Sequence, residues 1–273
     1  MILRRTLLAT PLALAATPAS AAPAAEPWPL WERHDAAAPT AIDHIPWARF
    51  LASYRRDAPD GIGRFAYRAV TPADRAALEA DIARLAALPI SRFNRAEQFA
   101  YWVNLYNALT VLTVLRHYPV KSIRDIAISP GWFSTGPWGA KLIEVEATKL
   151  SLDDIEHRIL RPVWRDPRIH YVVNCAALGC PDLPPVPLTA ANREATLDAA
   201  ARRFINHPRG VEMEGGRLAA SSLFIWYRDD FGRTPEELIQ HLRGFARQDL
   251  YSALAHIRNI SVDRYDWALN DAP

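Results

Sequence analysis

Apolar residues recur at helical spacing along most of the chain, and the strongest such segment is residues 95–117. Its middle reads Glu-Gln-Phe-Ala-Tyr-Trp-Val-Asn-Leu-Tyr-Asn-Ala-Leu-Thr-Val-Leu and is apolar almost all round, which is typical of a buried helix. Asn94 is suited to cap it, with Glu97 reaching back from the third helical position, and His117 and Pro119 mark its end. The pattern therefore predicts one buried central helix.

Shorter patterns surround this segment. Helical periodicity with start and stop signals predicts further helices at residues 46–54, 72–89, 152–160, 189–206, 222–227 and 235–246. Alternation predicts strands at residues 141–147, 168–174 and 259–265 and a hairpin at 211–218 with its turn at Gly215-Gly216. Short strands among more helix indicate an α+β fold. We expect a single domain in which the buried helix packs on a small, mainly antiparallel sheet with several helices around it.

The first 42 residues differ from the rest. Arg4-Arg5, an apolar run at 6–16 and Ala19-Ser20-Ala21 form the pattern of an export signal, residues 1–21, which is too short to span a bilayer. The paired arginines also permit twin-arginine export. Residues 22–42 are rich in proline and alanine and are predicted to be a tether before a domain at 43–273. The mature protein is expected to be periplasmic or secreted, with no membrane span after signal cleavage.

The charge composition limits the classes of partner that we expect. The 273 residues carry 32 basic and 30 acidic side chains, a formal charge of +2. This balance lacks the basic surplus that binding to a phosphate backbone requires, so we expect no nucleic acid partner. Half of the residues are hydrophobic, enough for a full core.

The run from residue 166 to 181 holds both cysteines, a histidine and an asparagine. On an extended strand His170 and Asn174 face the same side, and Cys175 joins them if the chain bends at Asn174. A thiol at the N-terminus of the following turn has a lowered pKa. Cys175 is then a candidate nucleophile with His170 or His157 as its base.

Two amides lie in the middle of the central helix, where capping rules do not put them. Asn104 and Asn107 are three residues apart and so share a face. An unpaired buried amide costs about 1–3 kcal/mol, so both should bond to something buried, and the bend that carries Cys175 is the expected partner. Glu156, next to His157, is a further candidate because a carboxylate can orient an imidazole.

Two other interpretations stay open. Cys175 and Cys180 are the only cysteines and lie five apart, so in an oxidising compartment they can form a disulfide or redox pair that closes a short loop. A metal site through His157, His170 and a thiol would need further ligands such as Asp153 or Glu156. No cofactor is predicted.

Five ordered motifs resemble one known family. They are Tyr101-Trp-Val-Asn-Leu-Tyr-Asn-Ala108, Ser151-Leu-Asp-Asp-Ile-Glu-His-Arg-Ile-Leu-Arg161, Arg168-Ile-His-Tyr-Val-Val-Asn-Cys-Ala-Ala-Leu-Gly-Cys-Pro181, Ile225-Trp-Tyr-Arg-Asp-Asp-Phe231 and Tyr265-Asp-Trp-Ala-Leu-Asn270. Over residues 45–270 the chain resembles the domain of unknown function 547 family. The resemblance implies a kind of protein and no established reaction. It places in signature blocks Asn104, Asn107, Glu156, His157, His170, Asn174, Cys175 and Cys180.

The hypothesis is an exported thiol-dependent hydrolase or acyl-transferase that acts on amide or thioester bonds of a small-molecule or peptide-like substrate. In it Cys175 attacks and His170 takes its proton, while Asn104, Asn107 or Asn174 orients the imidazole or binds the oxyanion. The rival is a non-catalytic envelope binding module with a structural Cys175–Cys180 disulfide.

Overall fold

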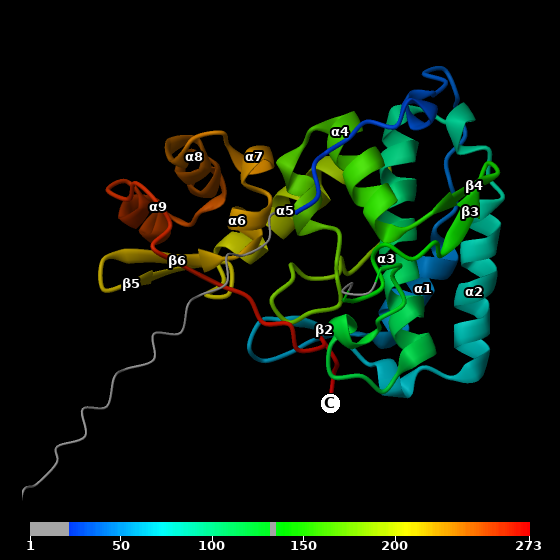
Figure 1. Ribbon diagram of the computed structural model, residues 1–273, viewed down its shortest axis with the longest axis horizontal. Helices are drawn as coiled ribbons and strands as arrows, with labels where there is room; N and C mark the ends of the chain where they lie inside the picture. The colour runs from blue at the N-terminus through cyan, green and yellow to red at the C-terminus, as the bar shows by residue number, and fades with distance from the viewer. Residues whose placement is uncertain (1–21, 132–134) are drawn as a thin grey trace, which may run out of the picture.

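A computed structural model describes residues 22–131 and 135–273, and Figure 1 shows their path. The predicted export signal, residues 1–21, lies outside the described residues, and so does the choice of export route. Among the described residues helix outweighs strand, and each strand is short. The predicted α+β single domain is confirmed.

Helix α3 (Arg95–His117) is the predicted central helix, and all its residues from 97 to 115 are buried. Asn94 caps it, because its Oδ1 accepts hydrogen bonds from the backbone N–H groups of Ala96 and Glu97 at 3.1 and 3.0 Å. Glu97 has a different role from the one predicted. Its Oε2 accepts a hydrogen bond from the N–H of Ile42 at 2.9 Å, which ties the segment before α1 to the central helix.

Two cores divide the packing. Helices α1 (Ile45–Tyr54) and α2 (Pro72–Ala86) lie beside α3 and form the larger core with the segments that follow it. The smaller core lies on the other side of the molecule in Figure 1 and is built from C-terminal elements. Its helices are α5 (Arg193–Ile205), α6 (Leu223–Trp226), α7 (Arg228–Phe231), α8 (Pro235–Phe245) and α9 (Gln248–Leu254).

The strands form three small sheets and not one. The antiparallel pairs are β1 (Arg55–Asp57) with β2 (Gly63–Phe65), β3 (Ile143–Val145) with β4 (Thr148–Leu150), and β5 (Val211–Glu214) with β6 (Arg217–Ser221). β7 (Val262–Arg264) adds to β6 in parallel. The predicted Gly215-Gly216 turn is confirmed, with φ angles of +55° and +78°.

The predicted strand at residues 168–174 is wrong, because the chain there forms a 3-10 helix, η6 (Pro167–Tyr171). Asp166 caps this helix by accepting a hydrogen bond from the N–H of Arg168 at 2.9 Å, and Pro167 occupies the first helical position. An aspartate followed by proline is a helix start signal, and it outweighs the β-branched residues that come after it. The bend that carries Cys175 therefore follows a helical turn.

The predicted helix at 152–160 forms mainly as a π-helix, η5 (Asp154–Leu160), which continues into α4 (Arg161–Trp164). Pro162 has no N–H, so one carbonyl of this segment lacks its helical donor, that of Arg158 at α-helical spacing or that of His157 at π-helical spacing. The N–H groups of Glu26 and Trp28 donate to the carbonyls of His157 and Arg158, at 3.0 and 3.2 Å.

Residues 22–32, here called the N-terminal strap, therefore lie along the domain, whereas the sequence predicted a tether. Trp31 is 3% exposed and packs edge-on against Trp102 of α3, with ring centroids 5.1 Å apart. The prediction gave too little weight to this aromatic side chain and to the carbonyls of η5 as hydrogen-bond acceptors. Pro27 and Pro29 alternate with the two donating residues, so the missing proline N–H groups cost no hydrogen bond.

Four short 3-10 helices complete the described elements: η1 (Pro29–Glu32), η2 (Tyr67–Ala69), η3 (Ile90–Arg92) and η4 (Ile123–Asp125). No helix within residues 22–131 and 135–273 is long and apolar enough to cross a membrane.

Candidate active site

The central helix braces the bend after η6 through one of its two amides. Asn107 donates from Nδ2 to the carbonyl of Val172 at 2.8 Å, and its Oδ1 accepts from the N–H of Asn174 at 2.9 Å. Asn174 continues the bracing, since its Nδ2 donates to the carbonyl of Pro181 at 2.8 Å and its Oδ1 accepts from Ala176 N–H at 2.9 Å. These bonds hold the two ends of the cysteine loop together.

The other amide has a separate partner. Asn104 donates to the carbonyl of Leu188 at 2.8 Å and accepts from the Leu188 N–H at 3.0 Å. Both predicted asparagines are thus bonded to buried backbone, but only Asn107 holds the bend. Their amides are engaged with backbone and position the loop.

The thiol pair, Cys175 and Cys180, consists of two free cysteines whose Sγ atoms lie 3.0 Å apart. A disulfide bond is about 2.05 Å long, so the two thiols are in contact and unbonded. The N–H of Cys175 donates to the Sγ of Cys180 at 3.0 Å, and the Tyr265 hydroxyl lies 3.0 Å from the Sγ of Cys175. The predicted disulfide is not present.

The two sulfurs have opposite environments. The hydrogen bond between the two thiols and the Tyr265 hydroxyl hold the pKa of Cys175 below its ordinary value, although burial opposes them. Burial raises the pKa of Cys180 well above its ordinary value, and the neighbouring Cys175 adds to this effect. Cys175 is half-buried, whereas Cys180 is 4% exposed. The more accessible sulfur is therefore the one that favours the thiolate.

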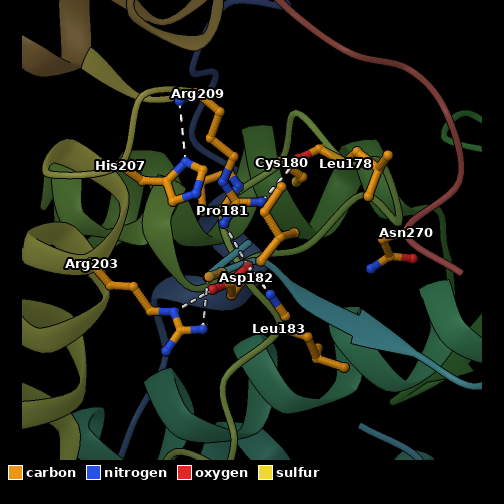
Figure 2. A network of polar contacts seen from close by, with 12 residues as sticks. Leu178, Cys180, Pro181, Asp182, Leu183, Arg203, His207, Arg209 and Asn270 are labelled. Carbon is orange, nitrogen blue, oxygen red and sulfur yellow. Dashed lines mark hydrogen bonds and ion pairs between the residues drawn. The ribbon is translucent and has the colours of Figure 1, made fainter. Parts of the chain in front are cut away.

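An aspartate that the sequence interpretation missed anchors the chain just past Cys180, as Figure 2 shows. Asp182 accepts hydrogen bonds from Arg203 and Arg209, each at 2.5 Å, and from the N–H of Gly63 at 2.8 Å. Arg209 also donates to the carbonyl of Leu178 at 2.9 Å, within the cysteine loop. The loop that holds the thiol pair is thus fixed from α3 on one side and from this aspartate on the other.

A second polar group, here called the imidazole clamp, consists of Glu156, His170 and Asp230. The Nε2 of His170 lies 2.6 Å from the Oδ2 of Asp230, and its Nδ1 lies 3.6 Å from the Oε1 of Glu156, an ion-pair distance. Tyr106 of α3 donates to the Oε2 of Glu156 at 3.1 Å, and the Tyr227 ring packs on His170 with centroids 4.0 Å apart.

These contacts settle the charges of the clamp. Burial would raise the pKa of Glu156, but the His157 and His170 imidazoles outweigh it and lower this pKa to about 2. Burial lowers the pKa of His170, yet Asp230 and Glu156 together raise it above its ordinary value. The clamp is therefore an ion pair network that favours imidazolium, and His170 is not held as a free base.

No imidazole bonds to the thiol pair. Neither His157 nor His170 has a ring nitrogen within hydrogen-bond distance of either sulfur among the described contacts. His157 instead contacts Arg161 Nη1 at 3.1 Å through Nδ1 and lies 3.6 Å from Asp153. The predicted cysteine–histidine hydrogen bond is thus not formed.

A cavity of about 900 Å³ brings the two groups to one space. Cys175, Cys180, Glu156, His157 and His170 all line it, so the structure brings these predicted residues together. The rest of its wall is largely aromatic and comes from Tyr106, Trp138, Trp226, Tyr227, Tyr265 and Trp267. Across the described part of the chain, no three His, Cys, Asp or Glu side chains form a group that could hold a metal ion.

Sequence reasoning missed Asp230 and Tyr265 as members of the site. Both belong to motifs that carried the family resemblance, at residues 225–231 and 265–270, so the signal was present in the chain. What the sequence could not give was their distance from residues 156 and 175.

These features define an α+β domain whose central helix braces a reduced pair of cysteines at the wall of an aromatic cavity. Residues 90–205 match the family described as protein of unknown function, DUF547, which supports the resemblance that the motifs indicate for this segment of the chain. The matched segment contains the first three of the five motifs, and the motifs at 225–231 and 265–270 lie beyond it. No curated protein and no solved structure matches the chain.

Proposed function

We propose that the protein is a thiol–disulfide oxidoreductase in which Cys175 attacks the substrate and Cys180 resolves the product. The observation that carries the proposal is the asymmetry of the thiol pair. The accessible sulfur has the lowered pKa, the buried one has the raised pKa, and the two Sγ atoms are 3.0 Å apart. Attack by an accessible thiolate followed by closure onto a buried thiol requires this order.

The reaction balances without another group. The Cys175 thiolate attacks one sulfur of a substrate disulfide, a Cys175–substrate disulfide forms, and the other half leaves as a thiolate. Cys180 then loses its proton to that thiolate and attacks the Sγ of Cys175, which releases the second half. The substrate gains two electrons and the one proton of Cys180, its second half leaves as a thiolate that takes a proton from solvent, and the protein ends as the Cys175–Cys180 disulfide. A low-molecular-weight thiol returns it to the reduced form.

This chemistry suits the absence of a hydrogen bond between sulfur and imidazole in the described structure. A cysteine whose pKa is lowered by neighbouring donors needs no general base to attack a disulfide. Closure of the internal bond requires the sulfurs to approach by about 1 Å. The loop has only four residues between the cysteines. The hydrogen bonds of Asn107 and Asp182 hold residues on either side of this loop, so they do not prevent the two sulfurs from approaching.

The test is a chromogenic aromatic disulfide applied to the wild type and to two single variants. The wild type should release both aromatic thiolates and end lighter by two hydrogens with no adduct. Cys180→Ser should release one thiolate and keep a stable adduct at Cys175. Cys175→Ser should react far more slowly. Stable adducts on both cysteines of the wild type would overturn the proposal, and two unreactive thiols would favour the non-catalytic binding module.

Acyl transfer by the same sulfur is the second candidate. The Tyr265 hydroxyl, 3.0 Å from the Sγ of Cys175, is placed to return a proton to a leaving group, and the cavity has room for an acyl chain. In this reaction the thiolate adds to a thioester carbonyl, the thiol leaves, and water releases the acid. Cys180 takes no part, so Cys180→Ser should keep thioester turnover if acyl transfer is the activity and lose disulfide turnover if it is not.

A further inference from the structure

The end of the N-terminal strap forms part of the wall of the Cys175 cavity. Ala22 and Pro23 both line it. The N–H of Ala22 donates to the carbonyl of Trp226 at 3.3 Å, and Trp226 belongs to the aromatic wall beside Tyr265. A segment that the sequence assigned to a tether thus reaches the candidate active site.

Several contacts fix the position of this end. Arg161 donates from Nη1 to the carbonyl of Pro23 at 2.6 Å, and the backbone bonds of Glu26 and Trp28 to η5 follow. The guanidinium of Arg158 lies over the Trp28 ring, 4.0 Å from its centroid. Because Pro162 lacks an N–H, one of these two strap bonds replaces a helix hydrogen bond that the chain cannot make.

The sequence predicts a cut at the same place. Ala19-Ser20-Ala21 is the small-x-small pattern after which a leader is removed, and the first residue after it is Ala22. Hydrolysis of that peptide bond adds water, leaves a carboxyl group on the released leader and an amine on Ala22. An α-amino group has a pKa of about 7.7–8.0, so this amine is largely an ammonium at neutral pH.

We propose that Ala22 is the amino terminus of the mature protein and that its α-ammonium binds a carboxylate of the substrate inside the Cys175 cavity. The proposal deepens the proposed function, on which it rests for the reactivity of Cys175, by naming a substrate class: a disulfide or thioester that carries a carboxylate. Leader removal then completes the binding site.

The charges around the cavity favour this assignment. The Glu156 carboxylate of this cavity already pairs with His170, and Asp153 lies 3.6 Å from His157. Arg124 is exposed and lies over the Trp267 ring of the same wall, 5.2 Å from its centroid. An added ammonium at Ala22 gives a second cation beside an aromatic surface, which suits an anionic ligand with an apolar body.

The experiment compares an anionic and a neutral alkylating probe of similar size, iodoacetate and iodoacetamide, at Cys175. It uses the chain that starts at Ala22, released from a removable fusion so that no residue is added. The same protein acetylated on the α-amine is the matched variant, prepared near pH 6.5, where the amine reacts ahead of lysine because its pKa is lower. A chain extended by two residues before Ala22 is the second variant. Site-resolved mass spectrometry gives each rate.

The expected result is a fall in the iodoacetate to iodoacetamide rate ratio of about three- to tenfold after acetylation, as for the loss of one partly screened charge contact. The extended chain should show the same fall. An unchanged ratio, with normal iodoacetamide labelling, would overturn this inference and leave the oxidoreductase proposal standing. Failure of iodoacetamide to label Cys175 would overturn both, since both require an open cavity. A mature amino terminus elsewhere than Ala22 would overturn only this inference.

Discussion

The thiol pair and the imidazole clamp contribute side chains to one cavity but differ in their contacts. The clamp forms ion pairs, whereas the thiols have not formed a bond. In the clamp, Glu156 and Asp230 both contact His170, and Asp230 also pairs with Arg161 at 2.6 Å. In the thiol pair, the sulfurs touch each other and a hydroxyl, and the bond that they could form is not made. Ion pairs hold the charged groups of the clamp to one another, whereas the two sulfurs can still form a bond. The difference assigns structure to the clamp and reactivity to the thiols.

The largest effect is expected from breaking the clamp. Glu156→Ala leaves His170 with one of its two anionic partners and Tyr106 without its acceptor. Loss of one member of a buried ion pair costs about 3–5 kcal/mol, so the free energy of unfolding should fall by that amount in denaturant titrations. Glu144→Ala, on an exposed position of β3, is the control and should stay within about 0.5 kcal/mol of wild type. A small effect at Glu156 would contradict a structural clamp.

The clamp also sets a pH dependence. The pKa of Glu156 is lowered from 4.5 to about 2 in the folded protein, so its contribution is present above pH 4.5 and is lost as the pH falls towards 2. His170 has the opposite sign, because its pKa is raised, and its contribution fades as the pH rises through the raised value. Unfolding measured from pH 5 to 2 should lose stability less steeply in Glu156→Gln than in the wild type. Equal slopes would mean that another carboxyl dominates.

The two asparagines of α3 provide a sharper contrast. Asn104→Ala and Asn107→Ala each orphan one buried N–H and one carbonyl, and each should cost about 1–3 kcal/mol or more. Only Asn107 holds the cysteine bend, so only Asn107→Ala should also change the alkylation rate of Cys175. If both variants changed that rate equally, the effect would come from general loosening of the core.

A smaller change is expected at the sulfur itself. Tyr265→Phe removes one hydrogen bond to the Cys175 thiolate and keeps the ring in the aromatic wall. A hydrogen bond to a charged group is worth about 1.5–3 kcal/mol, so the pKa of Cys175 should rise by about one to two units. Thiolate absorbance against pH in the Cys180→Ser background measures it. A pKa that does not rise would remove Tyr265 as a donor.

The smallest effect concerns the strap. Pro162→Ala restores one N–H, which can compete for an η5 carbonyl that now accepts from Glu26 or Trp28. These two amides should exchange with solvent faster, by about tenfold for each 1.4 kcal/mol of lost local stability, while global stability changes little. Unchanged exchange at both amides would show that the aromatic contacts alone hold the strap.

Much of the fold follows from local sequence signals. The central helix was predicted at its observed bounds because its apolar run and its cap agree. The turn at Gly215-Gly216 was predicted because two glycines accept the positive φ angles that the structure shows there. The predictions failed where two local signals compete. Residues 168–174 contain β-branched residues, but the Asp166-Pro167 start decided the outcome. The strap was missed because its partners are two carbonyls of η5 that lie 131 and 130 residues away.

The sequence predicted several residues of the site but not which of them contact one another. The expectation that an amide of α3 reaches the cysteine bend is met by Asn107, since a buried amide must find a partner. The expected pairing of His170 with a sulfur is not seen, because two carboxylates, at 156 and 230, hold the ring. Sequence spacing shows which residues carry chemistry but gives no distance between separate segments.

The most direct test of the account is the alkylation rate of each cysteine against pH, resolved by mass spectrometry on the reduced wild-type protein. The asymmetry of the thiol pair predicts that Cys175 reacts first, with an apparent pKa below its ordinary value, and that Cys180 reacts only at much higher pH. Earlier labelling of Cys180, or a common ordinary pKa for both sulfurs, would contradict the account.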